Sequence, residues 1–342
     1  MIFSLTDLTK DILEIIKLKG EFYHEPEYLK YECERYGATP FYYIDRFDQN
    51  LFVIPLMSRL INKKGLKDLS SPYGYSGYLT SLVVAEKIQN AILRFEAYIN
   101  QLGYVSTFLR LNPHENNLLL DEDSSKNHLI QSKVVVVNLK RSYQETADNY
   151  TSNRKREVEA FNNSDYEIEF VAAEGIEEFK QVYDSTMKRL DAAEYYFFDY
   201  NYYKMLSNLN DRIEIALCKH NGVLASAALF MKSTSVIQYH LGGTSTGFMK
   251  DSPIKFILDK AIQRYIGKHD VLNLGGGIGS KEDSLFKFKQ GYSPTTKRFS
   301  TLRIVNDLKK YNNLCQNFSK SEKKDFSQFF PLYRTPLSKQ QY

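Results

Sequence analysis

The sequence contains no tryptophan and only three cysteines among its 342 residues. Cys33, Cys218 and Cys315 are far apart along the chain. Small secreted domains held by disulfides carry many paired cysteines, and structural zinc sites need closely spaced cysteine or histidine ligands. The three scattered cysteines therefore argue against a disulfide framework and against a zinc knuckle, and they favour a reducing compartment.

Long apolar runs and blocks of one charge are also missing. No apolar run approaches the roughly 20 residues of a membrane-spanning helix, and the N-terminal segment spaces its apolar residues as a helix does, unlike a signal peptide. The formal net charge is only +4, without a Lys/Arg block that would indicate a nucleic-acid-binding segment. We expect a cytoplasmic protein without a transmembrane segment; peripheral contact with a membrane stays open.

The order of the predicted elements is repeated along the chain. In the first half, an aromatic-rich helix precedes a β-hairpin, a loop rich in glycine and tyrosine, a long amphipathic helix and a strand. The second half repeats this order at an offset of roughly 170 residues, with Asn221-Gly222 as a strong turn signal in its hairpin. The length also suits two domains. We therefore predict two similar α/β units.

Two glycine-rich segments come close to phosphate-binding motifs. GGTSTGFM, from Gly242, has the glycine spacing of a P-loop but places Phe248 and Met249 where Lys and Ser or Thr are required. LGGGIGS has Ser280 where the dinucleotide fingerprint needs its third glycine. We therefore interpret the glycines as positions where the backbone passes close to other backbone or to a ligand.

Signals of hydrolytic catalysis are absent from the sequence. It contains neither G-x-S-x-G nor H-E-x-x-H. His240, after Tyr239, ends a predicted central strand beside a glycine loop, which makes it the most interesting histidine. Packing or capping is the competing explanation for a histidine at such a position.

The segment SLFKFKQGY is predicted to be helical. A turn of 100° per residue places Leu285, Phe288 and Tyr292 on one apolar stripe, with Lys289 on the same side and Lys287 nearly opposite. An inward-facing ammonium is costly unless it meets a partner. Lys289 therefore either has a functional partner or extends its head group back to the surface.

Several segments resemble a known family. YHLGGTS, SPIKFIL and LNLGGG…DSLFKFKQGY resemble the second half of the Fem-type aminoacyltransferases and of the related polysaccharide-cluster acyltransferases of the GNAT superfamily, and SPYGYSG and FLRLNP resemble first-half segments. The similarity spans roughly residues 20–305. It implies an α/β (α+β) fold of two tandem GNAT-like domains, each a mixed, mainly antiparallel sheet flanked by helices. We expect domains at 1–143 and 144–305, the second with the active site, and a helical tail at 306–342 that packs back on the first domain.

The resemblance implies transfer of an acyl or aminoacyl group, without a metal, from acyl-CoA or aminoacyl-tRNA to an amine. The expected acceptor is a cell-envelope precursor or amino sugar, in peptidoglycan or polysaccharide biosynthesis. The family has a lysine at the position of Lys289, next to Phe288, so Lys289 is expected to contact the oxyanion or a substrate phosphate. Asp283, Tyr239 and His240 are weak candidates for the base, and deprotonation by the substrate itself is the alternative.

Substrate-binding residues are also implied by the resemblance. Arg189 suits contact with the phosphates of a nucleotide-linked or lipid-linked sugar, and Arg110 matches too, with a structural role as its alternative. The complete expected binding set is Arg189, Tyr73, Tyr75, Arg110, Gly276, Gly277 and Tyr292.

Departures from the family keep alternatives open. GGTSTGFMKDSPIKF does not match the pyrophosphate-binding segment of coenzyme-A users, so the donor is undecided between acyl-CoA and aminoacyl-tRNA. A non-catalytic GNAT-like module that binds a nucleotide-sugar or tRNA is the second hypothesis, and a nucleic-acid-binding protein is the third. The oligomeric state is not readable from the sequence.

Overall fold

The computed structural model describes all residues except 49, 63–64, 115–127, 317, 319–328 and 336–342. The chain divides into two compact units, which are residues 1–132 with 298–342 and residues 133–297. The sequence placed the boundary after residue 143 instead. The structure moves it because the end of β7 (His128–Asn138) pairs with β12 (Val271–Gly275) of the second unit, whereas β13 (Thr296–Val305) pairs with β6 (Ser106–Arg110) of the first.

The sheet of the first unit has the order β1-β2-β3-β4-β6-β13, with β5 paired to β3. Its neighbouring strands are antiparallel except for the parallel pair β4 and β6. The remaining strands are β1 (Ile2–Phe3), β2 (Thr39–Phe47), β3 (Asn50–Leu60), β4 (Lys67–Ser70) and β5 (Leu79–Thr80).

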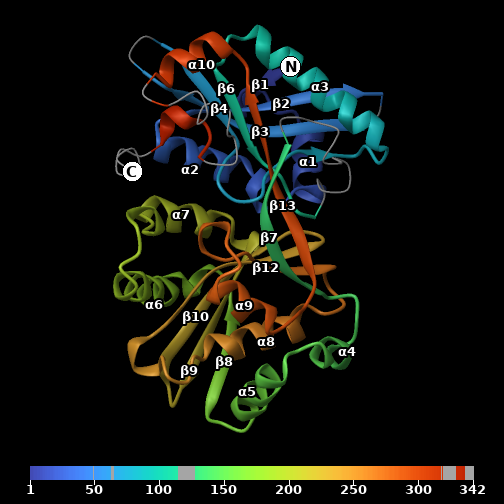
Figure 1. The fold of residues 1–342 in the computed structure, drawn as a ribbon. Coiled ribbons are helices and arrows are strands. Elements are labelled where there is room, and N and C mark those ends of the chain that lie inside the picture. Colours follow the sequence, from blue (N-terminus) through green and yellow to red (C-terminus); the bar gives the residue numbers. More distant parts are fainter. Residues whose placement is uncertain (49, 63–64, 115–127, 317, 319–328, 336–342) are drawn as a thin grey trace. The chain divides into compact units, whose positions relative to one another are not determined.

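Helices cover both faces of this sheet (Figure 1). Phe52 and Ile54 of β3 pack in the cluster formed with α3 (Ala85–Gln101). Leu51 and Val53, on the opposite face, pack in the cluster formed with α1 (Lys10–Lys19) and α2 (Pro26–Tyr36). Successive strand residues point to opposite faces, so β3 is apolar at consecutive positions because both of its faces are buried.

The C-terminal tail packs on the first unit. α10 (Leu308–Leu314) and the short helical turn Leu332–Arg334 contribute Tyr311 and Leu332 to a small apolar cluster with Val105 and Phe330. The sequence predicted a helical tail over 306–342, of which residues 317, 319–328 and 336–342 lie outside the described residues.

The second unit repeats the strand order of the first. Its sheet runs β7-β12-β11-β10-β9-β8, with neighbours antiparallel except for the parallel pair β11 and β12. α8 (Ile254–Tyr265) connects this parallel pair, as α3 connects β4 and β6. The remaining strands are β8 (Tyr166–Val171), β9 (Ile213–His220), β10 (Val223–Lys232) and β11 (Val236–Thr244). The predicted duplication and the mixed α/β class are thus confirmed.

Two groups of helices cover the sheet of the second unit (Figure 1). α8, α5 (Ser152–Asn162) and α9 (Ser284–Gln290) share one apolar cluster with Ala228 and Phe230 of β10. α6 (Ile176–Arg189) and α7 (Tyr200–Asn208) lie to the other side, and the short α4 (Tyr143–Asp148) precedes α5. The intervening β10 residues Leu229 and Met231 are also buried, so this central strand is covered on both faces.

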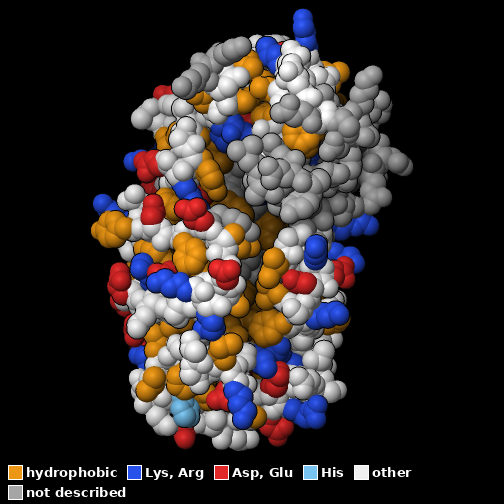
Figure 2. Space-filling model, turned by 60° about the vertical axis from the view of Figure 1, so that its left-hand side comes forward, with side chains coloured by type: hydrophobic (Ala, Val, Ile, Leu, Met, Phe, Trp, Pro, Cys, Tyr) orange, Lys and Arg blue, Asp and Glu red, His pale blue; other side chains and the backbone are white. Residues whose placement is uncertain are grey.

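The surface carries charges of both signs. On the face in Figure 2, Lys and Arg side chains are interspersed with Asp and Glu among the described residues. A protein that binds nucleic acid without sequence preference presents a basic stripe instead, so this face does not favour the third hypothesis. In the described part of the chain, no helix has the length and apolarity needed to cross a membrane.

Candidate functional site

The parallel strands β11 and β12 of the second unit are paired only along their first residues. Their ladder has three rungs, and the last joins Gln238 to Asn273. On the other side of β11, Leu229 pairs with Leu241 and Phe230 with Tyr239, so His240 is the additional residue of a β-bulge. Bulges redirect side chains and are frequent beside functional sites.

Two buried amides fill the end of this ladder. Gln238 Nε2 donates to the Tyr239 carbonyl at 2.7 Å, and Asn273 Oδ1 accepts from the Gly275 N–H at 2.8 Å. Gln238 Oε1 and Asn273 Nδ2 are buried without a partner, and such atoms are normally satisfied by water or ligand. The sequence analysis missed both residues. For Asn273 a signal was available, because it is a polar residue inside the apolar strand VLNLG.

Lys289 is a buried cation on α9. Its side chain is 7% exposed, and Nζ donates to the Gly276 carbonyl at 2.7 Å. Burial lowers the pKa of Lys289 to about 8, and the negative charge of Asp283 partly opposes this shift. Lys287 on the same helix is exposed. An ammonium has three donor hydrogens, and one of them is used in the hydrogen bond to the Gly276 carbonyl.

The predicted apolar stripe of this helix is wrong in detail. Phe286, and not Leu285, is fully buried on the side of Lys289, while Leu285 and Phe288 are half-buried. α9 ends at Gln290, so helical spacing does not extend to Tyr292. Tyr292 is buried separately, and its hydroxyl donates to the Lys255 carbonyl at 2.6 Å.

The glycines after β12 have a packing role. A Cβ at Gly277 would collide with the Lys281 carbonyl and with Asp283. The Asp283 carboxylate caps α9 by accepting from the Phe286 N–H at 3.0 Å, and it also accepts from the Ile278 N–H at 3.1 Å. The loop is therefore folded tightly against the start of α9, and Gly276 presents its carbonyl to Lys289.

The candidate bases on β11 and α9 are poorly suited to accept a proton. His240 Nε2 lies 2.8 Å from the Tyr202 hydroxyl, and burial lowers the His240 pKa to about 3. Burial likewise raises the pKa of Tyr239. The backbone N–H groups that Asp283 accepts lower its pKa. None of the three combines a free lone pair with a pKa near neutrality.

His240 is expected to stay neutral throughout the physiological range. Because its folded-state pKa lies below the ordinary value of 6.5, the unfolded chain binds the additional proton as the pH falls below 6.5, and stability is lost there. In NMR titrations, the His240 ring signals should not shift between pH 5 and 8, and they should titrate near 6.5 only after unfolding. A His240 titration near 6.5 in the folded protein would contradict this assignment.

Arg189 holds the end of β11. Its guanidinium donates to the Thr244 carbonyl at 3.0 Å and to the Thr246 hydroxyl at 3.2 Å. Its side chain is half-buried at the C-terminus of α6. The structure thus gives Arg189 partners within the protein, and phosphate binding stays a prediction.

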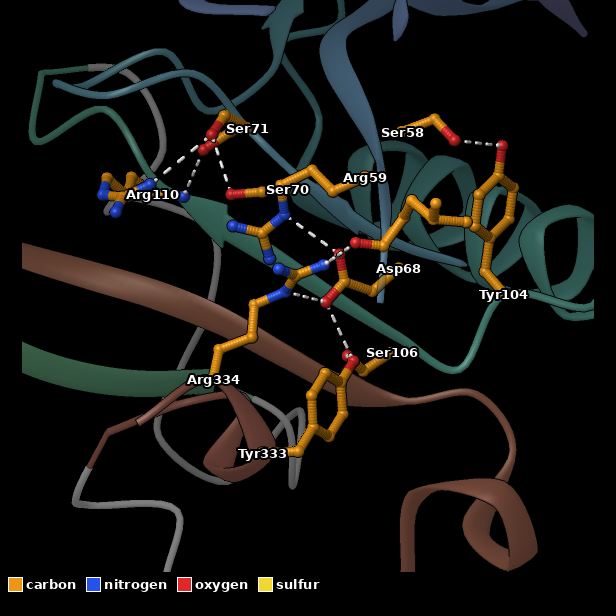
Figure 3. A network of polar contacts seen from close by, with 11 residues as sticks. Ser58, Arg59, Asp68, Ser70, Ser71, Tyr104, Ser106, Arg110, Tyr333 and Arg334 are labelled. Carbon is orange, nitrogen blue, oxygen red and sulfur yellow. Dashed lines mark hydrogen bonds and ion pairs between the residues drawn. The ribbon is translucent and has the colours of Figure 1, made fainter. Parts of the chain in front are cut away.

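Tyr73, Tyr75 and Arg110 belong to the first unit. Figure 3 shows Arg110 beside Ser71, whose carbonyl accepts from its guanidinium at 3.4 Å. The Arg110 guanidinium also lies 5.7 Å from the Tyr73 ring, and burial lowers the Arg110 pKa. Tyr75 packs edge-on against Phe299 at 5.2 Å. These three residues lie in a different unit from Lys289, and their part in substrate binding stays a prediction.

A separate cavity of about 490 Å³ lies between β8 and α8. Ile168, Phe256 and Lys260 are among its lining residues, whereas none of the predicted site residues lines it. Among the residues that the structure describes, no cluster of His, Cys, Asp or Glu could hold a metal.

The start of α8 does not offer a preformed pyrophosphate site. The N–H groups of Lys255 and Phe256 already donate to the carbonyls of Ser252 and Pro253, at 3.1 and 3.0 Å. Proline at position 253 has no N–H. Phosphate binding at a helix start uses free N–H groups, so the geometry agrees with the sequence mismatch and leaves the acyl donor undecided.

Comparisons with known proteins identify the fold. The sequence matches no protein family and no curated protein. The structure is similar to FemX, with a TM-score of 0.67, 12% identity, and coverage of 92% of this chain and 99% of FemX. It is also similar to a conserved protein of unknown function from Bacteroides thetaiotaomicron (TM-score 0.53, 13% identity, coverage of 82% and 89%) and to the C-terminal domain of a protein assigned as a lysylphosphatidylglycerol synthetase from Agrobacterium fabrum (0.52, 12%, 76% and 84%). At these identities the likeness establishes the fold alone: this protein has the fold of FemX, and it repeats one strand order in two units.

Proposed function

We propose that this protein is an acyltransferase that moves an acyl or aminoacyl group from an activated ester or thioester to an amine. The observation that carries the proposal is Lys289, a buried ammonium with a pKa of about 8 that donates to the Gly276 carbonyl. Burying an ammonium costs free energy unless it is paired and hydrogen-bonded, and the hydrogen bond described for Lys289 is to one neutral carbonyl. The similarity of the fold to FemX, together with the resemblance of the motifs around Lys289 to the Fem-type aminoacyltransferases, supports acyl transfer as the reaction.

Lys289 is assigned to the negative charge that develops during transfer. When an amine attacks the carbonyl of an ester or thioester, a C–N bond forms and the electron pair of the C=O bond moves to oxygen. The pair then returns, the C–O or C–S bond of the donor breaks, and the alcohol or thiol leaves with the proton that the amine loses. A preorganised donor beside that oxygen stabilises the transition state by about 3–4 kcal/mol. The two hydrogens that Lys289 does not donate to Gly276 supply such donors.

The attacking amine must lose a proton, and we propose that a group of the substrate or a water molecule accepts it. His240, Tyr239 and Asp283 have pKa values displaced from neutrality. We therefore favour deprotonation of the amine by the substrate itself or through water over deprotonation by one of these side chains.

The finer assignment concerns the two substrates. Acyl-CoA or aminoacyl-tRNA is proposed as the donor, and an amine of a cell-envelope precursor or amino sugar as the acceptor, on the resemblance of the motifs around Lys289. The partnerless Gln238 Oε1 and Asn273 Nδ2 are suited to polar atoms of either substrate.

A ligand panel tests this proposal. Thermal unfolding would be followed with acetyl-CoA, longer acyl-CoAs, UDP-amino sugars, UDP-muramyl-pentapeptide and aminoacyl-tRNA, for the wild type, Lys289→Ala and Lys287→Ala. We expect one donor and one acceptor to raise the melting temperature of the wild type and of Lys287→Ala, and to lose this effect in Lys289→Ala.

Other outcomes of the panel distinguish the alternatives. Stabilisation by a nucleotide-sugar or tRNA without any transfer to an amine would favour the non-catalytic binding module. Stabilisation that is equal in Lys289→Ala and the wild type would remove Lys289 from the site and overturn the proposal.

A further inference from the structure

Arg154, in the first turn of α5, is a second buried cation beside α9. Its side chain is 5% exposed, and its guanidinium donates to the Phe288 carbonyl at 3.0 Å. The same guanidinium lies 4.8 Å from the centre of the Phe288 ring and 4.3 Å from that of Tyr292. Arg154 therefore holds both the backbone and the ring of the residue that precedes Lys289.

Backbone contacts join the same two helix ends. The Thr151 N–H, at the start of α5, donates to the Gly291 carbonyl at 3.0 Å, just after α9 ends. Gly291 leaves room for Arg154 and for the carbonyl that it binds, because a Cβ there would lie 3.0 Å from Nε and one terminal nitrogen of the guanidinium and 3.0 Å from the Phe288 carbonyl oxygen. A cation beside the last carbonyls of a helix is also favourable electrostatically.

Charge neutralisation alone does not explain a buried arginine here. Glu157 lies 3.2 Å from the Arg154 guanidinium, but it also pairs with Lys255 at 2.8 Å. An apolar residue of similar volume often replaces a buried ion pair without loss of stability. What only a guanidinium supplies is a donor to the Phe288 carbonyl together with a planar face for two aromatic rings.

We propose that Arg154 is a positioning residue that holds the last turn of α9 so that Lys289 donates to the Gly276 carbonyl. Only the consequence for acyl transfer rests on the proposed function, because that consequence requires Lys289 to take part in transfer. The positioning itself is measurable without a substrate, because a displaced Lys289 becomes hydrated and titrates like an ordinary lysine.

The experiment measures the titration of Lys289 in the full chain. Trace acetylation with acetic anhydride at a series of pH values, followed by peptide mass spectrometry, gives the midpoint of each lysine. Arg154→Lys keeps the charge but loses the planar fork, and Gly291→Ala crowds the guanidinium while retaining it. Gly291 has φ −55°, so alanine fits its backbone. Arg156→Ala, at an exposed position of the same helix, is the matched control.

We expect the Lys289 midpoint to lie near 8 in the wild type and in Arg156→Ala. It should rise by about one pH unit or more in Arg154→Lys, and in the same direction in Gly291→Ala, as desolvation is relieved. A folded Arg154→Lys protein with an unchanged midpoint would overturn the proposal. If Arg154→Lys does not fold by circular dichroism, an unchanged midpoint in Gly291→Ala overturns it.

A transfer assay separates this inference from the proposed function. A shifted midpoint in a protein whose wild type transfers no acyl group would leave the positioning role in place and remove the function. Transfer by the wild type with an unshifted midpoint in both variants would retain the function and remove the positioning role.

Discussion

Replacing Lys289 by alanine is expected to lower the rate constant of acyl transfer about 10²–10³-fold, the usual loss when one preorganised oxyanion donor is removed. The reason is that the Lys289 ammonium is buried and held against the Gly276 carbonyl. A water molecule in the space left by alanine would have to be ordered before it could donate to the same oxygen. The measurement is kcat for the donor and acceptor pair that the ligand panel identifies. Lys287→Ala, an exposed lysine of the same helix, should retain the wild-type rate.

The pH dependence of this effect has a definite sign. Lys289 is a useful donor as a cation, and its pKa of about 8 makes the wild-type rate fall as the pH rises through about 8. Because the unfolded chain keeps the Lys289 proton to about 10.5, it binds more protons than the folded chain between these values, and the contribution of Lys289 to stability rises with pH there. Lys289→Met should lose both features. A transfer rate that is independent of pH from 7 to 10 would contradict the assignment.

Asp68→Ala is expected to lower the free energy of unfolding of the protein by about 3–5 kcal/mol. Asp68 is fully buried, and Figure 3 shows two arginines converging on it. Arg59 Nε lies 2.9 Å from Oδ1, Arg334 Nε lies 2.6 Å from Oδ2, and the Tyr333 hydroxyl donates to Oδ2 at 2.9 Å. Removing the carboxylate leaves two largely buried cations uncompensated.

The control for Asp68 is an ion pair with similar geometry but different burial. Asp11 lies 2.8 Å from Arg46, and both side chains are more than half exposed. Asp11→Ala should cost no more than about 1 kcal/mol. Urea unfolding of both variants tests the comparison. Equal losses would mean that the Asp68 cluster does not hold the C-terminal residues 333–334 to the first unit.

The sequence carried enough information for the repeated architecture. Asn221 and Gly222 both adopt positive φ in the hairpin of β9 and β10, as their turn signal predicts. The amphipathic α3 and the apolar α8 were readable from helical spacing. β8 was missed although Tyr166–Val171 alternates apolar residues with exposed glutamates, which is the pattern of a half-buried strand at the edge of a sheet.

The candidate site was only partly predictable. Helical spacing places Lys289 inward, but α9 has only about two turns after its Asp283 cap, and the spacing misassigned Leu285 and Phe286. Gln238 and Arg154 were missed for a different reason. Their importance comes from where β11 separates from β12 and from the carbonyl of Phe288, 134 residues away from Arg154, and local sequence does not encode such contacts.

The most direct test of the central claim is to detect the transferred group by mass spectrometry. Each donor of the panel would be mixed with each amine acceptor and with wild-type protein, Lys287→Ala or Lys289→Ala, and the acceptor would be weighed. We predict that the acceptor gains the mass of the acyl or aminoacyl group with the wild type and Lys287→Ala, and that Lys289→Ala yields little or none. Transfer by Lys289→Ala at the wild-type rate, or the absence of transfer from every donor, would contradict the assignment of Lys289 to an acyl-transfer site.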